Sequence, residues 1–146
     1  MSSNTKEVLI AFGRLLMSLI FIYAGFSKIF AYHQTSVYME MHGITAILQP
    51  AVIALEILGG FALAIGLFTR VVATILSIYS VAAIFIFLVP PANQFGIVLM
   101  LAEISFVGGL IDFSVRGGGQ VSIDHYLLSG KSLSAIPQTT TGSKDI

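Results

Sequence analysis

Four ionisable side chains lie inside long apolar stretches of the sequence: Arg14, Lys28, Glu56 and Glu103. At the centre of a bilayer a charged side chain costs roughly 2.5–3.5 kcal/mol on insertion scales. Each of the four therefore needs a partner, water or a path to the lipid headgroups. Together they could form salt bridges, bind a polar group inside a membrane, or carry a proton.

The composition places these residues in a membrane protein. Of 146 residues, 56% are hydrophobic and 10% are charged, whereas soluble domains carry about 25% charged residues. The expected partner is therefore the lipid bilayer. The net charge is zero, which gives no reason to expect a nucleic acid. Because the chain has no Cys, thiolate metal sites and Cys-ligated iron–sulfur clusters are excluded.

Four stretches have the roughly 20 apolar residues that a spanning helix needs. They cover residues 8–30, 51–68, 71–89 and 95–113. All connections except 31–50 are short, and short loops make neighbouring helices antiparallel. The sequence therefore predicts an all-α, polytopic membrane protein. We expect an antiparallel four-helix bundle over residues 1–132 and a disordered polar tail over residues 133–146.

The connections contain their own signals. Apolar residues recur at helical spacing in segment 31–50: Val37, Met41, Ile44 and Ile47. This spacing predicts a short interfacial helix. Pro90 and Pro91 stop the third span, and Asn93 is the expected N-cap of the fourth.

The distribution of basic residues predicts the orientation. With four spans, one side of the membrane holds the basic residues of the termini and loops: Lys6, Arg70, Arg116, Lys131 and Lys144. The loops on the other side have no Lys or Arg, and Lys28 lies at the membrane edge. The positive-inside rule then places both termini in the cytoplasm. We expect a multi-pass protein of the plasma (inner) membrane.

The depths of the four buried charges predict two pairs. Counting about 1.5 Å of rise per residue places Lys28 and Glu56 in the outer half of the membrane. The same count places Arg14 and Glu103 in the inner half. The depth-matched pairs are therefore Lys28 with Glu56 and Arg14 with Glu103.

Other interpretations of these charges stay open. Arg14 and Lys28 are 14 residues apart, close to four turns, so they share the face of the first helix that carries Ser18. Their long side chains could also snorkel to opposite headgroup layers without a partner. A carboxylate cannot reach as far, so Glu56 and Glu103 are each either paired or protonated. A purely structural salt bridge is an alternative to a functional role for all four.

Three segments resemble the DoxX family of small four-helix membrane proteins. They are GRLLMSLIFIYAGFSKIF, EILGGFALAIGLFTR and GGGQVSID. The positions that match the family's motifs are Arg14, Gly25, Lys28, Glu56, Gly59, Gly60, Gly66, Thr69, Arg70, Gly117, Gly118, Gly119, Ser122 and Asp124. The resemblance covers nearly all of the chain except the tail. Glu103 is outside the pattern, so its role rests on the physical argument alone.

The resemblance implies a membrane subunit of an oxidoreductase, since some members serve thiosulfate:quinone oxidoreductase or other membrane redox complexes. It implies a soluble or membrane redox partner and supplies no catalytic residue. We expect no intrinsic cofactor and no metal, with a quinone as the candidate ligand. An apolar cleft with a few convergent polar groups would bind it. The candidate groups are Arg14, Lys28, Glu56, Glu103 and, as donors, Tyr23 or Tyr79.

Two other functions stay open, and so does the question of whether the protein is an enzyme. It could be a scaffold or assembly protein whose charge pairs only hold the bundle. It could also be a small proton-coupled transporter in which Glu56 or Glu103 cycles its proton. Four helices are few for alternating access, so a transporter would require a homo-oligomer.

Overall fold

The computed structural model describes residues 3–134, and every regular element in this range is a helix. In chain order the elements are α1 (Ser3–Phe30), α2 (Tyr32–Met41), the short 3₁₀ helix η1 (Ala46–Leu48), α3 (Gln49–Ile65), α4 (Thr69–Ala83), the short π-helix η2 (Ile84–Leu88), α5 (Gln94–Arg116) and α6 (Ile123–Ser134). Four helical stretches of this range are long and apolar enough to cross a membrane: Thr5–Phe30, Ala46–Ile65, Thr69–Leu88 and Gln94–Arg116. The predicted all-α, polytopic class is therefore confirmed.

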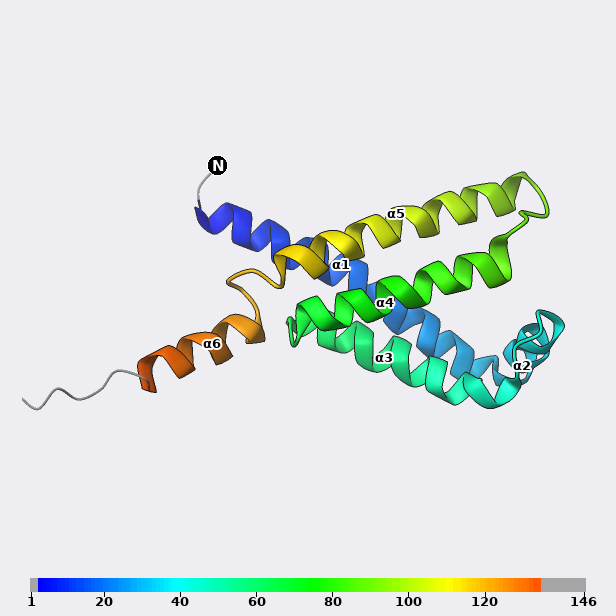
Figure 1. Cartoon of the computed structure of the whole chain (residues 1–146), viewed down its shortest axis with the longest axis horizontal. Coiled ribbons are helices and arrows are strands. Elements are labelled where there is room, and N and C mark those ends of the chain that lie inside the picture. The colour runs from blue at the N-terminus through cyan, green and yellow to red at the C-terminus, as the bar shows by residue number, and fades with distance from the viewer. Residues whose placement is uncertain (1–2, 135–146) are drawn as a thin grey trace, which may run out of the picture.

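The four long helices pack as two pairs that share a middle contact. α1 packs mainly on α3, α5 packs mainly on α4, and α3 lies against α4. Figure 1 shows α2 at one end of these helices and α6 beyond the other. We name the first the α2 end and the second, which holds the start of α1, the N-terminal end. α1 and α3 run in opposite directions, because Gly25 lies against Ile57 whereas Ile22 lies against Gly60.

The core of the bundle is small. It is formed by Phe21 of α1, Leu63 of α3, Ala73 and Leu76 of α4 and Leu110 of α5. Most of the large apolar side chains on the long helices are exposed instead, as expected for helices that face lipid. Because lipid tails are as apolar as Leu, association of such helices depends on close packing and polar contacts.

Paired glycines bring α3 close to its neighbours on two sides. A Cβ added to Gly60 would lie 3.1 Å from the backbone nitrogen of Ile22 in α1. A Cβ added to Gly59 would lie 3.0 Å from the Leu76 Cδ2 atom of α4. Small residues of this kind permit the close backbone approach that stabilises helix pairs in lipid. Both glycines therefore serve helix packing.

Gly60→Ala is expected to destabilise the protein by about 1–3 kcal/mol, because the added methyl group forces α1 away from α3. Gly108→Ala is the matched control, since nothing lies within 4 Å of a Cβ at Gly108 of α5. Its thermal midpoint should stay unchanged or rise slightly. Heating both variants in one detergent and measuring the monodisperse fraction by size exclusion gives the comparison. Equal midpoints would contradict close α1–α3 packing at Gly60.

Several ends of elements agree with the sequence, and others differ. The predicted interfacial helix is present as α2, but it ends at Met41 before Gly43, whose φ is 76°. Asn93 caps α5 as predicted, since its Oδ1 atom accepts from the Gly96 N–H at 2.9 Å. α3 ends at Ile65 rather than at residue 68, because Gly66 adopts the left-handed conformation that terminates helices.

The C-terminal region contains a helix that the sequence did not predict. α6 covers Ile123–Ser134 and so includes the first two residues of the predicted tail. Its short, polar sequence lacks the long apolar run that identifies the spanning helices. Residues 135–146 of the predicted tail lie outside the described residues.

Candidate functional site

Three polar side chains from three helices meet toward the α2 end. Lys28 Nζ of α1 lies 2.7 Å from each carboxylate oxygen of Glu56 in α3. The Tyr79 hydroxyl of α4 donates a hydrogen bond to Glu56 Oε1 at 2.5 Å. Glu56 is buried, whereas the Lys28 side chain is 25% exposed. The predicted Lys28–Glu56 pair is confirmed, and Tyr79 joins it.

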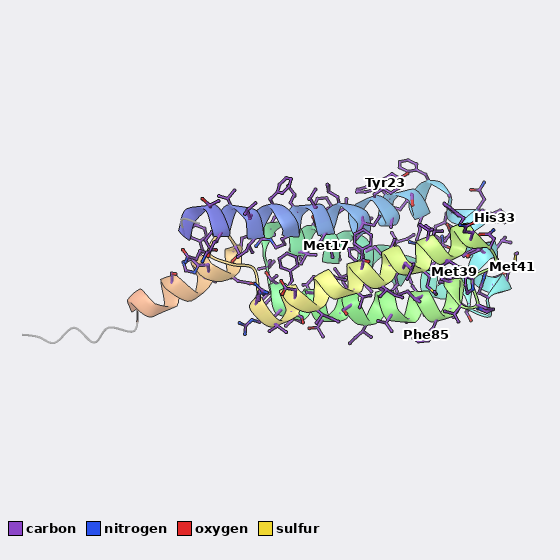
Figure 2. All side chains as sticks on the ribbon, turned by 90° about the horizontal axis from the view of Figure 1, so that it is seen from above. Met17, Tyr23, His33, Met39, Met41 and Phe85 are labelled. Carbon is purple, nitrogen blue, oxygen red and sulfur yellow. The ribbon has the colours of Figure 1, made fainter. Side chains whose placement is uncertain are left out.

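A glycine positions this cluster. Gly25 lies one turn before Lys28 on α1, and a Cβ there would lie 3.3 Å from Glu56 Cβ and 3.3 Å from the Ile57 backbone nitrogen. The close approach lets the short Glu56 side chain reach Lys28. The other candidate donor, Tyr23, is 74% exposed and points away from the bundle from the outer face of α1 (Figure 2). It takes no part in the cluster.

An apolar cavity of about 450 Å³ adjoins the cluster. This volume is within the range of small-molecule sites, about 300–1,000 Å³. Its wall includes apolar residues from four elements: Phe21 and Ala24 of α1, Met39 of α2, Ile84 and Phe87 of η2, and Phe106 of α5. Lys28, Glu56, Tyr79 and Glu103 also line it. A second cavity, of about 330 Å³ between α3 and α4, is lined by apolar residues and glycine alone.

Glu103 enters the cavity wall from α5. Its carboxyl group makes no ion pair or hydrogen bond with another residue between 3 and 134. The predicted pair of Arg14 with Glu103 is wrong. Equal depth does not make two residues lateral neighbours, and α5 packs mainly on α4, with few contacts to α1. The structure therefore gathers three of the four predicted charges, Lys28, Glu56 and Glu103, around one cavity.

Arg14 lies at the N-terminal end of the bundle, where its partners are main-chain carbonyl groups. Its guanidinium donates to Ala64 O at 3.3 Å, to Gly118 O at 2.5 Å and to Val121 O at 2.9 Å. Arg14 is 3% exposed. It thus fastens α1 to the last turn of α3 and to the loop that follows α5. These residues are named the Arg14 clasp.

Asp124 completes the N-terminal end by capping α4. Its carboxylate accepts from the backbone N–H groups of Phe68 at 2.6 Å and Thr69 at 2.8 Å. The N-cap residue Phe68 makes no side-chain cap of its own, and the first N–H groups of a helix otherwise lack partners. A carboxylate there also interacts favourably with the helix dipole. The cap therefore comes from α6, far along the chain.

The remaining glycine-rich positions surround the clasp closely. A Cβ at Gly118 would lie 2.6 Å from Thr69 Oγ1 and 2.9 Å from Arg14 Nη1. Ser122 is buried and donates to Gly119 O at 2.6 Å. The sequence gave no residue-level sign that carbonyl groups would bind Arg14 or that Asp124 would cap α4. The only signal was their shared membership of the motif positions.

Comparisons with known proteins agree with this arrangement. The family model described as DoxX matches residues 9–89. The inner membrane protein YqjF of Escherichia coli (strain K12) is 32% identical over 122 residues, which cover 84% of this chain and 94% of that protein. No solved structure was found to be significantly similar. The region that matches the family model includes Lys28, Glu56 and Tyr79 but not Glu103.

Proposed function

Because the chain belongs to the DoxX family of membrane proteins, we propose that it is the integral membrane subunit of a quinone-linked redox complex. The proposed quinone site is the cavity of about 450 Å³ near the α2 end. The observation that carries this proposal is the meeting of Lys28, Glu56, Tyr79 and Glu103 on one wall of an otherwise apolar cavity. Ligand sites commonly combine apolar walls with a few such polar groups.

The packing of α1 and α5 supports access from the lipid. These helices approach each other near the N-terminal end, where a Cβ on Gly109 would lie 2.8 Å from Met17 Cε. Toward the α2 end they diverge (Figure 1), and Ala24 of α1 and Glu103 of α5 line the cavity between them. Both of these residues are half-buried. A ring could therefore occupy the cavity while its apolar tail extends between α1 and α5 into the membrane.

The basic residues support a cytoplasmic N-terminal end. Lys6 lies at the start of α1, Arg70 at the start of α4 and Arg116 at the end of α5, so the three share that end. Lys28, toward the opposite end, is bound by Glu56. The positive-inside rule then places both termini in the cytoplasm and the cavity in the outer half of the membrane.

A redox role of this kind requires a partner. The chain has no Cys, and none of its three His residues lies within the four candidate spans. We therefore propose that a soluble or membrane-bound oxidoreductase subunit exchanges electrons with the bound quinone. The residues described above would hold and orient the quinone head group.

Quinone is expected to co-purify with the full-length protein in mild detergent, enriched relative to bulk phospholipid. Glu56→Gln should remove most of this enrichment, because it weakens the bonds that hold Lys28 and Tyr79 in the cavity wall. Glu40→Gln is the matched control, since Glu40 is exposed on α2 and does not line the cavity. Extraction and quantification of quinone per protein gives the measurement. The proposal fails if wild type and Glu56→Gln carry the same background amount.

A further inference from the structure

We propose that this cavity prefers a ligand whose head group donates hydrogen bonds, a hydroquinone or another lipophilic phenol, and that Glu103 is the acceptor. The inference rests on the proposed function, because it specifies which form of the quinone the same site binds. It follows from the hydrogen-bonding state of the four polar groups around the cavity.

The donors of the site are already engaged. Lys28 contacts both oxygens of Glu56, and the Tyr79 hydroxyl also donates to Glu56. A tyrosine hydroxyl has a single proton to donate. An oxidised quinone presents only carbonyl acceptors, so it would have to draw donors away from Glu56. Leaving a buried carboxylate short of partners is costly.

The acceptor of the site, by contrast, is free. The Glu103 carboxyl group has no partner within residues 3–134 and borders an apolar space. Ionised carboxylates only accept hydrogen bonds. A phenolic O–H would supply the missing bond, and a bond to a charged group is among the stronger ones.

The charge of the cavity points the same way. Lys28 balances one carboxylate, that of Glu56, and Glu103 adds a second negative charge. A neutral donor such as a phenol suits this balance, whereas an anionic ligand would be repelled. Phe21 and Phe106 also line the cavity, and aromatic side chains pack well against a ligand ring.

A redox-inert pair of probes tests the hydrogen-bond preference directly. The probes are an alkylresorcinol and its dimethyl ether, which share a ring and tail but differ in the two O–H donors. Binding to the full-length protein in detergent is measured by calorimetry. We expect the resorcinol to bind the wild type about tenfold more tightly than the ether, or more.

Two substitutions assign this preference to Glu103. Glu103→Gln should reduce the resorcinol preference several-fold, and Glu103→Leu, which cannot accept, should abolish it. Asp112→Asn is the matched control, because it makes the same carboxyl-to-amide change on α5 at a residue that is exposed and bound to Arg116. It should keep the wild-type preference.

The outcomes separate this inference from the proposed function. Equal binding of the two probes, or an unchanged preference in Glu103→Leu, overturns the inference. A short-chain benzoquinone and its hydroquinone, titrated without oxygen, test the proposed function in the same protein. If neither of them binds while the resorcinol preference depends on Glu103, the donor-selective site stands and the quinone-linked role fails. If both bind equally and Glu103 has no effect, the inference alone fails.

Discussion

Arg14→Met is expected to lower the free energy of unfolding by about 3–5 kcal/mol, the largest effect that we expect from a single substitution. Arg14 is buried and donates to the carbonyl groups of Ala64, Gly118 and Val121. Hydrogen bonds from a charged donor contribute about 1.5–3 kcal/mol each. Methionine removes all of them and leaves these carbonyl groups without that donor. The N-terminal end should therefore separate first on heating.

The measurement is the thermal midpoint of monodisperse protein in one detergent, which should fall by about 10 °C or more. Arg14→Lys should give an intermediate midpoint, because Lys keeps the charge but lacks the planar fork that binds several acceptors. Arg116→Met is the control: the Arg116 side chain is 72% exposed in its pair with Asp112. Exposed pairs contribute about 0–1 kcal/mol. If Arg14→Met melts with the wild type, the clasp does not hold the bundle together.

The two charge pairs illustrate what depth counting can and cannot predict. Helical rise is constant, so the sequence placed Lys28 level with Glu56, and the two residues form an ion pair. The same count placed Arg14 level with Glu103, but this pair does not form. Depth carries no information on which helices are lateral neighbours. Here α1 pairs with α3 and α5 pairs with α4.

The partners of Arg14 could not be predicted for a second reason. Every residue type has a carbonyl group, so no side chain marks Ala64, Gly118 or Val121 as an acceptor. Apolar runs, in contrast, predict spanning helices well, because about 20 residues are needed to cross the hydrocarbon. The ends of those helices depended on local backbone conformation, as Gly66 shows at the end of α3.

The two ends of the bundle therefore differ in kind. At the N-terminal end Arg14 and Asp124 bind backbone groups, and little space is left around them: a Cβ at Gly118 would collide with Thr69. Toward the α2 end, Lys28 and Glu56 lie beside a cavity. Polar groups that only stabilise a fold have no need of adjoining space. This contrast favours structural work for Arg14 and ligand binding for the Lys28–Glu56 cluster.

Glu56→Leu is expected to destabilise the protein by about 3 kcal/mol, near the lower end of the range for breaking a buried ion pair. The substitution leaves Lys28 without its carboxylate and removes the acceptor of Tyr79. Lys28 is 25% exposed, so it can partly recover by snorkelling, which limits the loss. Lys28→Met in the same chain should restore much of the stability, because apolar replacement of a whole buried pair is often neutral. Thermal midpoints of both single variants and the double variant give the coupling, expected at about 1–3 kcal/mol.

Adding Tyr79→Phe to that double variant separates stability from function. With Lys28→Met, Glu56→Leu and Tyr79→Phe together, no group of the cluster is left without a partner, so the midpoint should return close to that of the wild type. The cavity keeps its apolar walls but loses three of its four polar lining groups. If this variant folds normally and no longer carries quinone, the three residues serve the ligand rather than the fold. If it folds and carries quinone as the wild type does, the cluster is not a ligand site, and the scaffold interpretation replaces the proposed function.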